Sequence, residues 1–124
     1  MPVHKGMRTV VETRQFIRDA EANGLDDAWR LSVVDTVAND PEHGDLLTET
    51  GGYRKFRAAR PGGGKSGGFR VLSLYPGEGY PVYLILVFGK NEKANVSAKE
   101  KKALKKAVDE LIAAHEPKRK AVEK

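Results

Sequence analysis

Residues 53–88, YRKFRAARPGGGKSGGFRVLSLYPGEGYPVYLILVF, decide the fold of this chain. The stretch predicts three strands, at 53–59, 69–75 and 81–88, because each run is rich in β-branched, aromatic or alternating residues. A glycine-rich loop at 60–68 joins the first two strands, and the turn Pro76-Gly77-Glu78-Gly79 joins the last two. The run at 81–88 is apolar on both faces, which is typical of a strand in the middle of a sheet. The stretch therefore predicts a small antiparallel meander.

Helices are expected on the N-terminal side of this meander, after a short β-branched strand at 8–12. Thr13 is a suitable cap for a helix that runs to about Ala22 and ends at Asn23-Gly24. A second helix follows at 26–38 and forms a helical hairpin with the first. Its expected buried face consists of Leu25, Ala28, Trp29, Ser32, Val33 and Val37.

A last helix is expected after the meander. Ser97 and Glu100 have the spacing of a capping box, which marks a helix start. Pro117 is expected to end this helix, and residues 118–124 to form a flexible basic tail. Its expected buried stripe consists of Ala103, Leu104, Ala107, Val108, Leu111 and Ile112.

These elements predict a single α+β domain over residues 1–124: an antiparallel sheet of about four strands, an N-terminal helical hairpin and a C-terminal helix. We expect the helices to pack on one face of the sheet. The other face is then open, and alternation along the strand places Lys55 and Arg57 together on it.

Composition narrows the function classes. The chain has no cysteine, which excludes disulfides and thiolate metal sites, and its three histidines are far apart in sequence, so we predict neither a metal nor a cofactor. The net charge is +5 and the pI is about 9.5. No apolar run is long enough to span a membrane, and no signal peptide is evident, so we expect a cytoplasmic protein.

The basic excess is concentrated between residues 53 and 70, where no acidic residue offsets it. Clustered cations repel one another unless an anion lies among them, and arginine matches phosphate in a bidentate geometry. A solvated basic face is the alternative. We favour a phosphate backbone as the partner of this cluster, in which we single out Arg54, Lys55, Arg57, Lys65 and Arg70.

Two neighbouring features bear on this interpretation. Gly64-Lys65-Ser66 resembles the end of a nucleotide-binding loop, but Ala59 stands where the first glycine is needed and a strand, not a helix, follows. We instead expect a loop that carries Lys65 to a phosphate. Tyr75 is a candidate for stacking on a base, as aromatics on nucleic-acid-binding sheets do.

Three segments in this order resemble a known family: GYRKFR at 52–57, PGGGKSGGFRV at 61–71 and YLILVFGKNEKANVS at 83–97. Together they are similar to RelE/HigB-type toxins of bacterial type II toxin–antitoxin systems, closest to the HigB-like branch. The resemblance implies a RelE-like fold and a metal-independent endoribonuclease, an mRNA interferase that cuts mRNA in the A site of the 70S ribosome. It also implies neutralisation by a cognate antitoxin, often a helix-turn-helix protein.

By position, the resemblance assigns catalytic roles to Lys55, Arg57, Arg70 and Lys90, with Lys93 just beyond in the same basic stretch. We expect Arg54, Lys65, Lys93 and Tyr75 to bind RNA. Some members use a tyrosine in the last segment as general base. Here the nearby positions are Asn95 and Val96, so either Lys55 or Lys90 transfers the proton, or this chain is a slower or differently arranged nuclease. A non-catalytic RNA- or ribosome-binding module with the same basic face, and a protein-interaction domain, are the alternatives.

Overall fold

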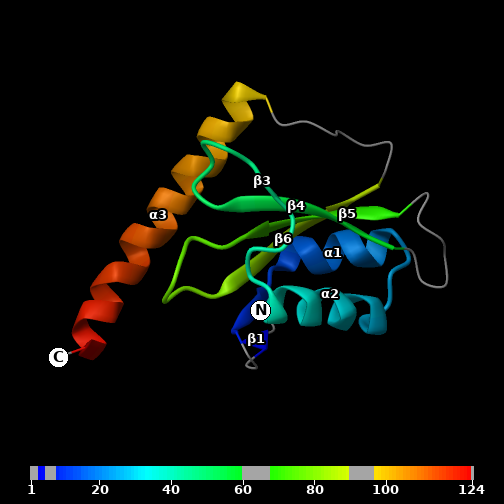
Figure 1. Cartoon of the computed structure of the whole chain (residues 1–124), viewed down its shortest axis with the longest axis horizontal. Helices are drawn as coiled ribbons and strands as arrows, with labels where there is room; N and C mark the ends of the chain where they lie inside the picture. The colour runs from blue at the N-terminus through cyan, green and yellow to red at the C-terminus, as the bar shows by residue number, and fades with distance from the viewer. Residues whose placement is uncertain (1–2, 5–7, 60–67, 90–96, 124) are drawn as a thin grey trace.

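The computed structural model describes residues 3–4, 8–59, 68–89 and 97–123. A twisted mixed sheet lies between two helical layers (Figure 1). The elements in chain order are β1 (Val3–His4), β2 (Val10–Glu12), α1 (Arg14–Ala22), α2 (Asp27–Asn39), β3 (Asp45–Leu46), β4 (Tyr53–Ala58), β5 (Phe69–Leu74), β6 (Val82–Phe88) and α3 (Ala98–Glu123).

The α+β class and the antiparallel meander β4–β5–β6 are confirmed, and two details of the predicted sheet are wrong. The sheet has six strands in the order β1-β2-β6-β5-β4-β3, not about four. Its β2–β6 pair is parallel, so the sheet is mixed. The central position predicted for β6 is confirmed, because β2 and β5 lie on its two sides. The two strands that the sequence did not predict, β1 and β3, are two residues each and depend on their neighbours for pairing.

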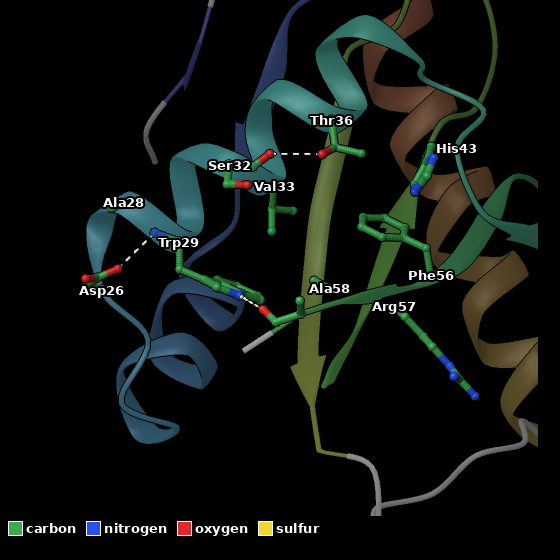
Figure 2. Close-up of a pocket in the computed structure, with 11 residues that line it drawn as sticks. Asp26, Ala28, Trp29, Ser32, Val33, Thr36, His43, Phe56, Arg57 and Ala58 are labelled. Carbon is green, nitrogen blue, oxygen red and sulfur yellow. Dashed lines mark hydrogen bonds between the residues drawn. The ribbon is translucent and has the colours of Figure 1, made fainter. Parts of the chain in front are cut away.

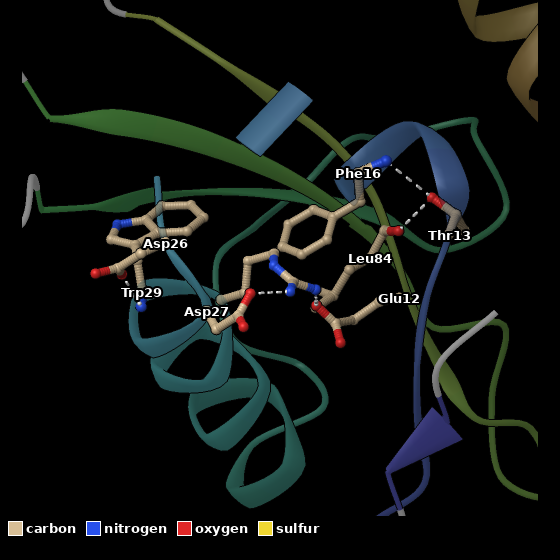
Figure 3. A network of polar contacts seen from close by, with 8 residues as sticks. Glu12, Thr13, Phe16, Asp26, Asp27, Trp29 and Leu84 are labelled. Carbon is tan, nitrogen blue, oxygen red and sulfur yellow. Dashed lines mark hydrogen bonds and ion pairs between the residues drawn. The ribbon is translucent and has the colours of Figure 1, made fainter. Parts of the chain in front are cut away.

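The predicted helix starts are confirmed by their caps. The Thr13 hydroxyl accepts a hydrogen bond from the Phe16 N–H at 3.2 Å and also donates to the Leu84 carbonyl of β6 at 2.7 Å (Figure 3). The Asp26 carboxylate accepts from the Trp29 N–H at the start of α2. Ser97 and Glu100 form the expected reciprocal box, with distances of 3.0 and 3.2 Å. These caps satisfy N–H groups that have no partner within their helices.

The edge of β6 beyond the short strand β2 is covered by α1. The Thr13 N–H donates to the Leu84 carbonyl at 3.2 Å. Further along, the Asp19 carboxylate accepts from the Val87 N–H at 3.0 Å, and its other oxygen accepts from Gln15. Side chains of α1 thus take the place of a longer β2, and they fix the end of β6 that leads toward Lys90.

The N-terminal helices and α3 pack on opposite faces of the sheet, so the expectation of one open face is wrong. One core joins α1 and α2 to Phe56, Val71 and Leu84. A second joins α3 to Tyr53, Leu72 and Leu74. Strand residues alternate between faces, and the meander carries large apolar residues on both, so it requires two covering layers.

The buried faces of two helices differ from those predicted. In α2, Ala28 and Ser32 are exposed, while Val34 is buried. In α3, Ala103 and Ala107 are exposed, and Val108 is the residue at the centre of the contact, at 1% exposure.

The predicted end of α3 at Pro117 is also wrong, because the helix continues to Glu123. A proline inside a helix removes one hydrogen bond but does not forbid a helix built from lysine, alanine and glutamate on both sides.

A buried ion pair ties α2 to β2. The Glu12 carboxylate, whose side chain is 3% exposed, accepts from the Arg30 guanidinium at 2.9 Å, and Arg30 also contacts Asp27 (Figure 3). Asp27 makes the largest contribution to raising the pKa of Arg30, and Glu12 adds to it, although burial acts in the opposite direction. Arg30 is therefore engaged in holding two elements together.

Candidate functional site

Two arginines of the predicted cluster lie directly opposite each other. Arg57 of β4 pairs with Arg70 of β5 in the antiparallel register. Directly opposed residues have their Cβ atoms about 5 Å apart and extend to the same face. Arg57 is exposed and Arg70 is partly exposed. Two guanidinium groups thus leave neighbouring strands side by side.

The face that carries this pair is the one on which α3 packs. Arg70 neighbours Leu72 at a spacing of two residues along β5, and Leu72 belongs to the core under α3. Arg70 also pairs with Phe88 of β6, which packs against the same core. Figure 2 shows the Arg57 side chain directed away from Trp29 and Val33, which lie on the α2 side of the sheet.

Lys55 lies on the same face, two residues before Arg57 and about 7 Å along the strand. Its cross-strand neighbours are Leu72 of β5 and, on the other side, Asp45 of β3. The sequence interpretation considered only the cations around Lys55. The short strand β3 adds a carboxylate beside it, and nothing in the local pattern of 53–59 indicated this.

Arg54 and Tyr75 are not brought together with this pair. Arg54 points to the opposite face from Arg57, since the two are an odd number of residues apart on one strand. Tyr75 follows the far end of β5, is 8% exposed and belongs to the core under α1 and α2. The guanidinium of Arg8 lies 5.5 Å from its ring centroid. Tyr75 is thus a core residue that also contacts Arg8.

Three other predicted site residues, Lys65, Lys90 and Lys93, lie outside the described residues. In the sequence, the segments that contain them follow β4 and β6. Among the residues that the structure describes, no group of three or more histidine, aspartate or glutamate side chains could hold a metal ion.

Phe88 is a neighbour that the sequence interpretation treated only as part of the apolar third strand. The rows of the sheet run Arg57–Arg70–Phe88 and Lys55–Leu72–Leu86, so a partly exposed aromatic ring completes the row of the two arginines. Phe88 lies beside Arg70 because of the strand register. The antiparallel pairing was predictable from the hairpins, but the register was not.

A family model described as RelE toxin of the RelE / RelB toxin–antitoxin system matches residues 7–124. No helix in the described part of the chain is long and apolar enough to cross a membrane. The match spans the helical hairpin, the meander with its paired arginines, and α3. This chain therefore belongs to the RelE toxin family of toxin–antitoxin systems.

Proposed function

We propose that this toxin is a ribosome-dependent endoribonuclease that cleaves translated mRNA in the A site, and that a cognate antitoxin neutralises it. The observation that carries the proposal is the Arg57–Arg70 pair, which offers two guanidinium groups on one face of the sheet. Guanidinium donates two parallel hydrogen bonds to a phosphate, so adjacent arginines suit one phosphodiester. Membership of the RelE family supplies the toxin role.

The proposed reaction is a transesterification within the RNA. The 2′-OH attacks the adjacent phosphorus, and the bond to the 5′-oxygen breaks, giving a 2′,3′-cyclic phosphate and a 5′-OH end. A base takes the proton of the 2′-OH, and an acid protonates the leaving oxygen. RNA supplies its own nucleophile, so the reaction requires no metal. Arg57 and Arg70 stabilise the additional negative charge of the pentacoordinate phosphorus, a contribution of about 3 kcal/mol for each well-placed donor.

Proton transfer is assigned to Lys55 or Lys90. Lys55 shares the face of the arginine pair, and its neighbour Asp45 can orient it through opposite charge. Lys90 follows β6 closely, beyond Phe88 and Gly89. Lys65 and Lys93 remain proposed contacts to flanking phosphates. Arg54 and Tyr75 are left out of the proposed site, because their positions separate them from the pair.

The ribosome completes the site in this proposal. It holds the mRNA so that the 2′-oxygen, the phosphorus and the leaving oxygen lie in line, and such positioning supplies a large part of the rate. Translated mRNA as substrate also implies that the toxin acts in the cytoplasm. Cations on the protein steer it toward the ribosome, whose surface is dominated by phosphate.

Mapping of mRNA ends after induction tests the proposal. Expression without antitoxin should arrest growth and produce new 5′ ends inside translated codons. Arg70→Ala should abolish both effects while the protein stays folded, whereas Arg54→Ala, on the other face, should retain them. Growth arrest without new ends would favour the alternative of a non-catalytic ribosome-binding module.

A further inference from the structure

A groove of about 570 Å³ lies between α2 and the end of β4, on the face opposite the arginine side chains (Figure 2). The helix presents small residues to it, and the strand presents apolar ones. His43 stands at one end, with its ring edge-on to Phe56 at 4.8 Å. The lining residues that matter here are Ala28, Ser32 and Thr36 of α2 and Phe56, Ala58 and Ala59 of the strand and its extension.

The backbone of β4 faces this groove with an edge that no described strand covers. β3 pairs only with Arg54 and Lys55. The Tyr53 carbonyl accepts from the Leu47 N–H on this side, and the Ala59 carbonyl accepts from the Trp29 indole N–H at 2.8 Å. Alternate residues of a strand direct their N–H and C=O groups to the same side. The N–H and C=O of Arg57 therefore point into the groove.

An exposed strand edge of this kind is suited to one ligand geometry. Extended peptides bind by adding a strand to such an edge, and neighbouring hollows accept alternate side chains. A second hollow of about 580 Å³ shares the Ala28–Ser32–Thr36 row of α2 and continues to Leu31. Leu31 is 50% exposed, which is high for a leucine in a folded domain.

The charge of this surface identifies the class of partner. Residues 26–52 contain seven acidic residues and one arginine, in a chain whose net charge is +5. All seven carboxylates are exposed, but Asp45 lies beside Lys55 on the other face and Glu49 lines a hollow against α3. Arg30 is already paired with Glu12 and Asp27. Asp26 lines the groove and Asp35 lines the second hollow. Such a surface repels RNA and attracts a cationic segment.

We propose that this groove binds an extended, lysine- or arginine-containing segment of the antitoxin, which adds a short strand at Arg57. The assignment of the partner rests on the proposed function. The docked segment contacts the backbone of Arg57, whereas the Arg57 side chain leaves the opposite face of the sheet. The antitoxin would thereby be anchored to the strand that carries the phosphate site, without occupying that site through this segment.

Affinity for the antitoxin tests the surface. The probe is the full-length antitoxin encoded beside the toxin gene, titrated by calorimetry against the purified toxin. Ser32→Lys with Asp35→Lys fills the groove and reverses its charge, and we expect at least a 30-fold loss of affinity. Asp109→Lys with Ala113→Lys, at two exposed positions of α3, makes the same change in charge and should remain within 2-fold of wild type. Equal affinities of all three proteins would overturn the proposal.

Hydrogen exchange on the wild-type complex tests the strand addition without any substitution. The Arg57 amide should exchange at least 10-fold more slowly in the complex, whereas amides of α3 around Asp109 should change little. No slowing at Arg57, or slowing confined to α3, would contradict the proposed docking. Both measurements are made without RNA, so a toxin that fails to cleave RNA still gives a clear answer on the groove.

Two other occupants are separable outcomes. If a second copy of this chain fills the groove, sedimentation of the toxin alone should show a concentration-dependent dimer that the Ser32→Lys/Asp35→Lys variant lacks. If RNA fills it, a single-stranded oligonucleotide should slow exchange at Arg57. Either result would overturn the assignment to the antitoxin.

Discussion

Arg57 and Arg70 are directly opposite each other on adjacent antiparallel strands, and among the described residues no carboxylate shares their row of the sheet. Like charges in this position destabilise a sheet, and a fold that serves stability alone gains nothing from them. Such a pair is therefore expected where function requires two cations at a cost in stability.

Neutralising either arginine should lower the cleavage rate without lowering the free energy of unfolding. Arg57→Gln or Arg70→Gln should lower the cleavage rate by about 100-fold, since each removes one charged donor from the phosphate. The same substitutions should leave the free energy of unfolding unchanged or raise it by about 0.5 kcal/mol, since they relieve repulsion. Paired measurements of cleavage rate and urea unfolding check this. A loss of activity that parallels a loss of stability would contradict the assignment.

The salt dependence of RNA binding should change with the same substitutions. For single strands, each phosphate contact contributes about 0.7 to the slope of log K against log salt concentration. Arg70→Gln should lower the magnitude of this slope by about that amount, whereas Arg54→Gln should not. Fluorescence titrations of each variant with a short single-stranded RNA, at salt concentrations from about 50 to 200 mM, measure both slopes.

The Glu12–Arg30 pair should be important for stability. Arg30→Ala leaves the Glu12 carboxylate buried without its guanidinium, and we expect a loss of about 3 kcal/mol or more. The double substitution Glu12→Leu/Arg30→Met should recover much of this loss, because the buried carboxylate is removed together with its guanidinium. Urea unfolding of the three proteins checks the order. If the double variant is the least stable of them, the pair has another role.

Alkaline pH should destabilise the fold through two tyrosines. Burial raises the pKa of Tyr53, and burial together with Tyr80 raises that of Tyr83, above the usual 10.0. The unfolded chain then releases these protons at lower pH than the folded chain. The stabilisation is complete below about pH 10 and is lost as the pH rises through the raised values. Tyr53→Phe/Tyr83→Phe should flatten the fall in unfolding free energy between pH 9 and pH 11, a range chosen around the ordinary tyrosine pKa.

Gly52 should not tolerate a side chain. Its φ is +122°, and a Cβ there would lie 2.4 Å from the Tyr75 carbonyl oxygen. Gly52→Ala should destabilise the protein by about 2 kcal/mol or more, through both the backbone conformation and the clash. Gly24→Ala, also at positive φ but with open space around it, is the matched control and should cost less. Thermal unfolding of both variants measures the difference.

Local signals were sufficient for most of the elements. The caps at Thr13 and Ser97 and the β-branched runs of the meander gave the helix starts and the long strands close to their observed bounds, whereas the end of α3 was missed. β1 and β3 could not be predicted, because two residues carry no periodicity and form a strand only when a partner is present. The amphipathic stripe of α3 shows that the helix packs on the sheet, but it does not show which face of the sheet the helix covers.

The site was predictable where strand alternation decides it, and not elsewhere. Alternation placed Lys55 and Arg57 on one face, and the hairpin brought Arg70 to them. The interpretation of Tyr75 relied on its place near the sheet in sequence, but its ring is in the core beneath α1 and α2. Asp45 and Phe88 became neighbours of the cations through register, which depends on the whole sheet. The groove was hidden because Ala28 and Ser32 fit the apolar stripe of α2.

Cleavage of a programmed ribosome complex tests the central claim most directly. Purified toxin is added to 70S ribosomes with a defined codon in the A site, and the mRNA carries either ribose or 2′-O-methylribose at the nucleotide that is cut. The account predicts a 2′,3′-cyclic phosphate product from the ribose mRNA, none from the methylated mRNA, and a large loss of rate with Arg57→Gln or Arg70→Gln. Undiminished cleavage of the methylated mRNA, or by both arginine variants, would contradict it.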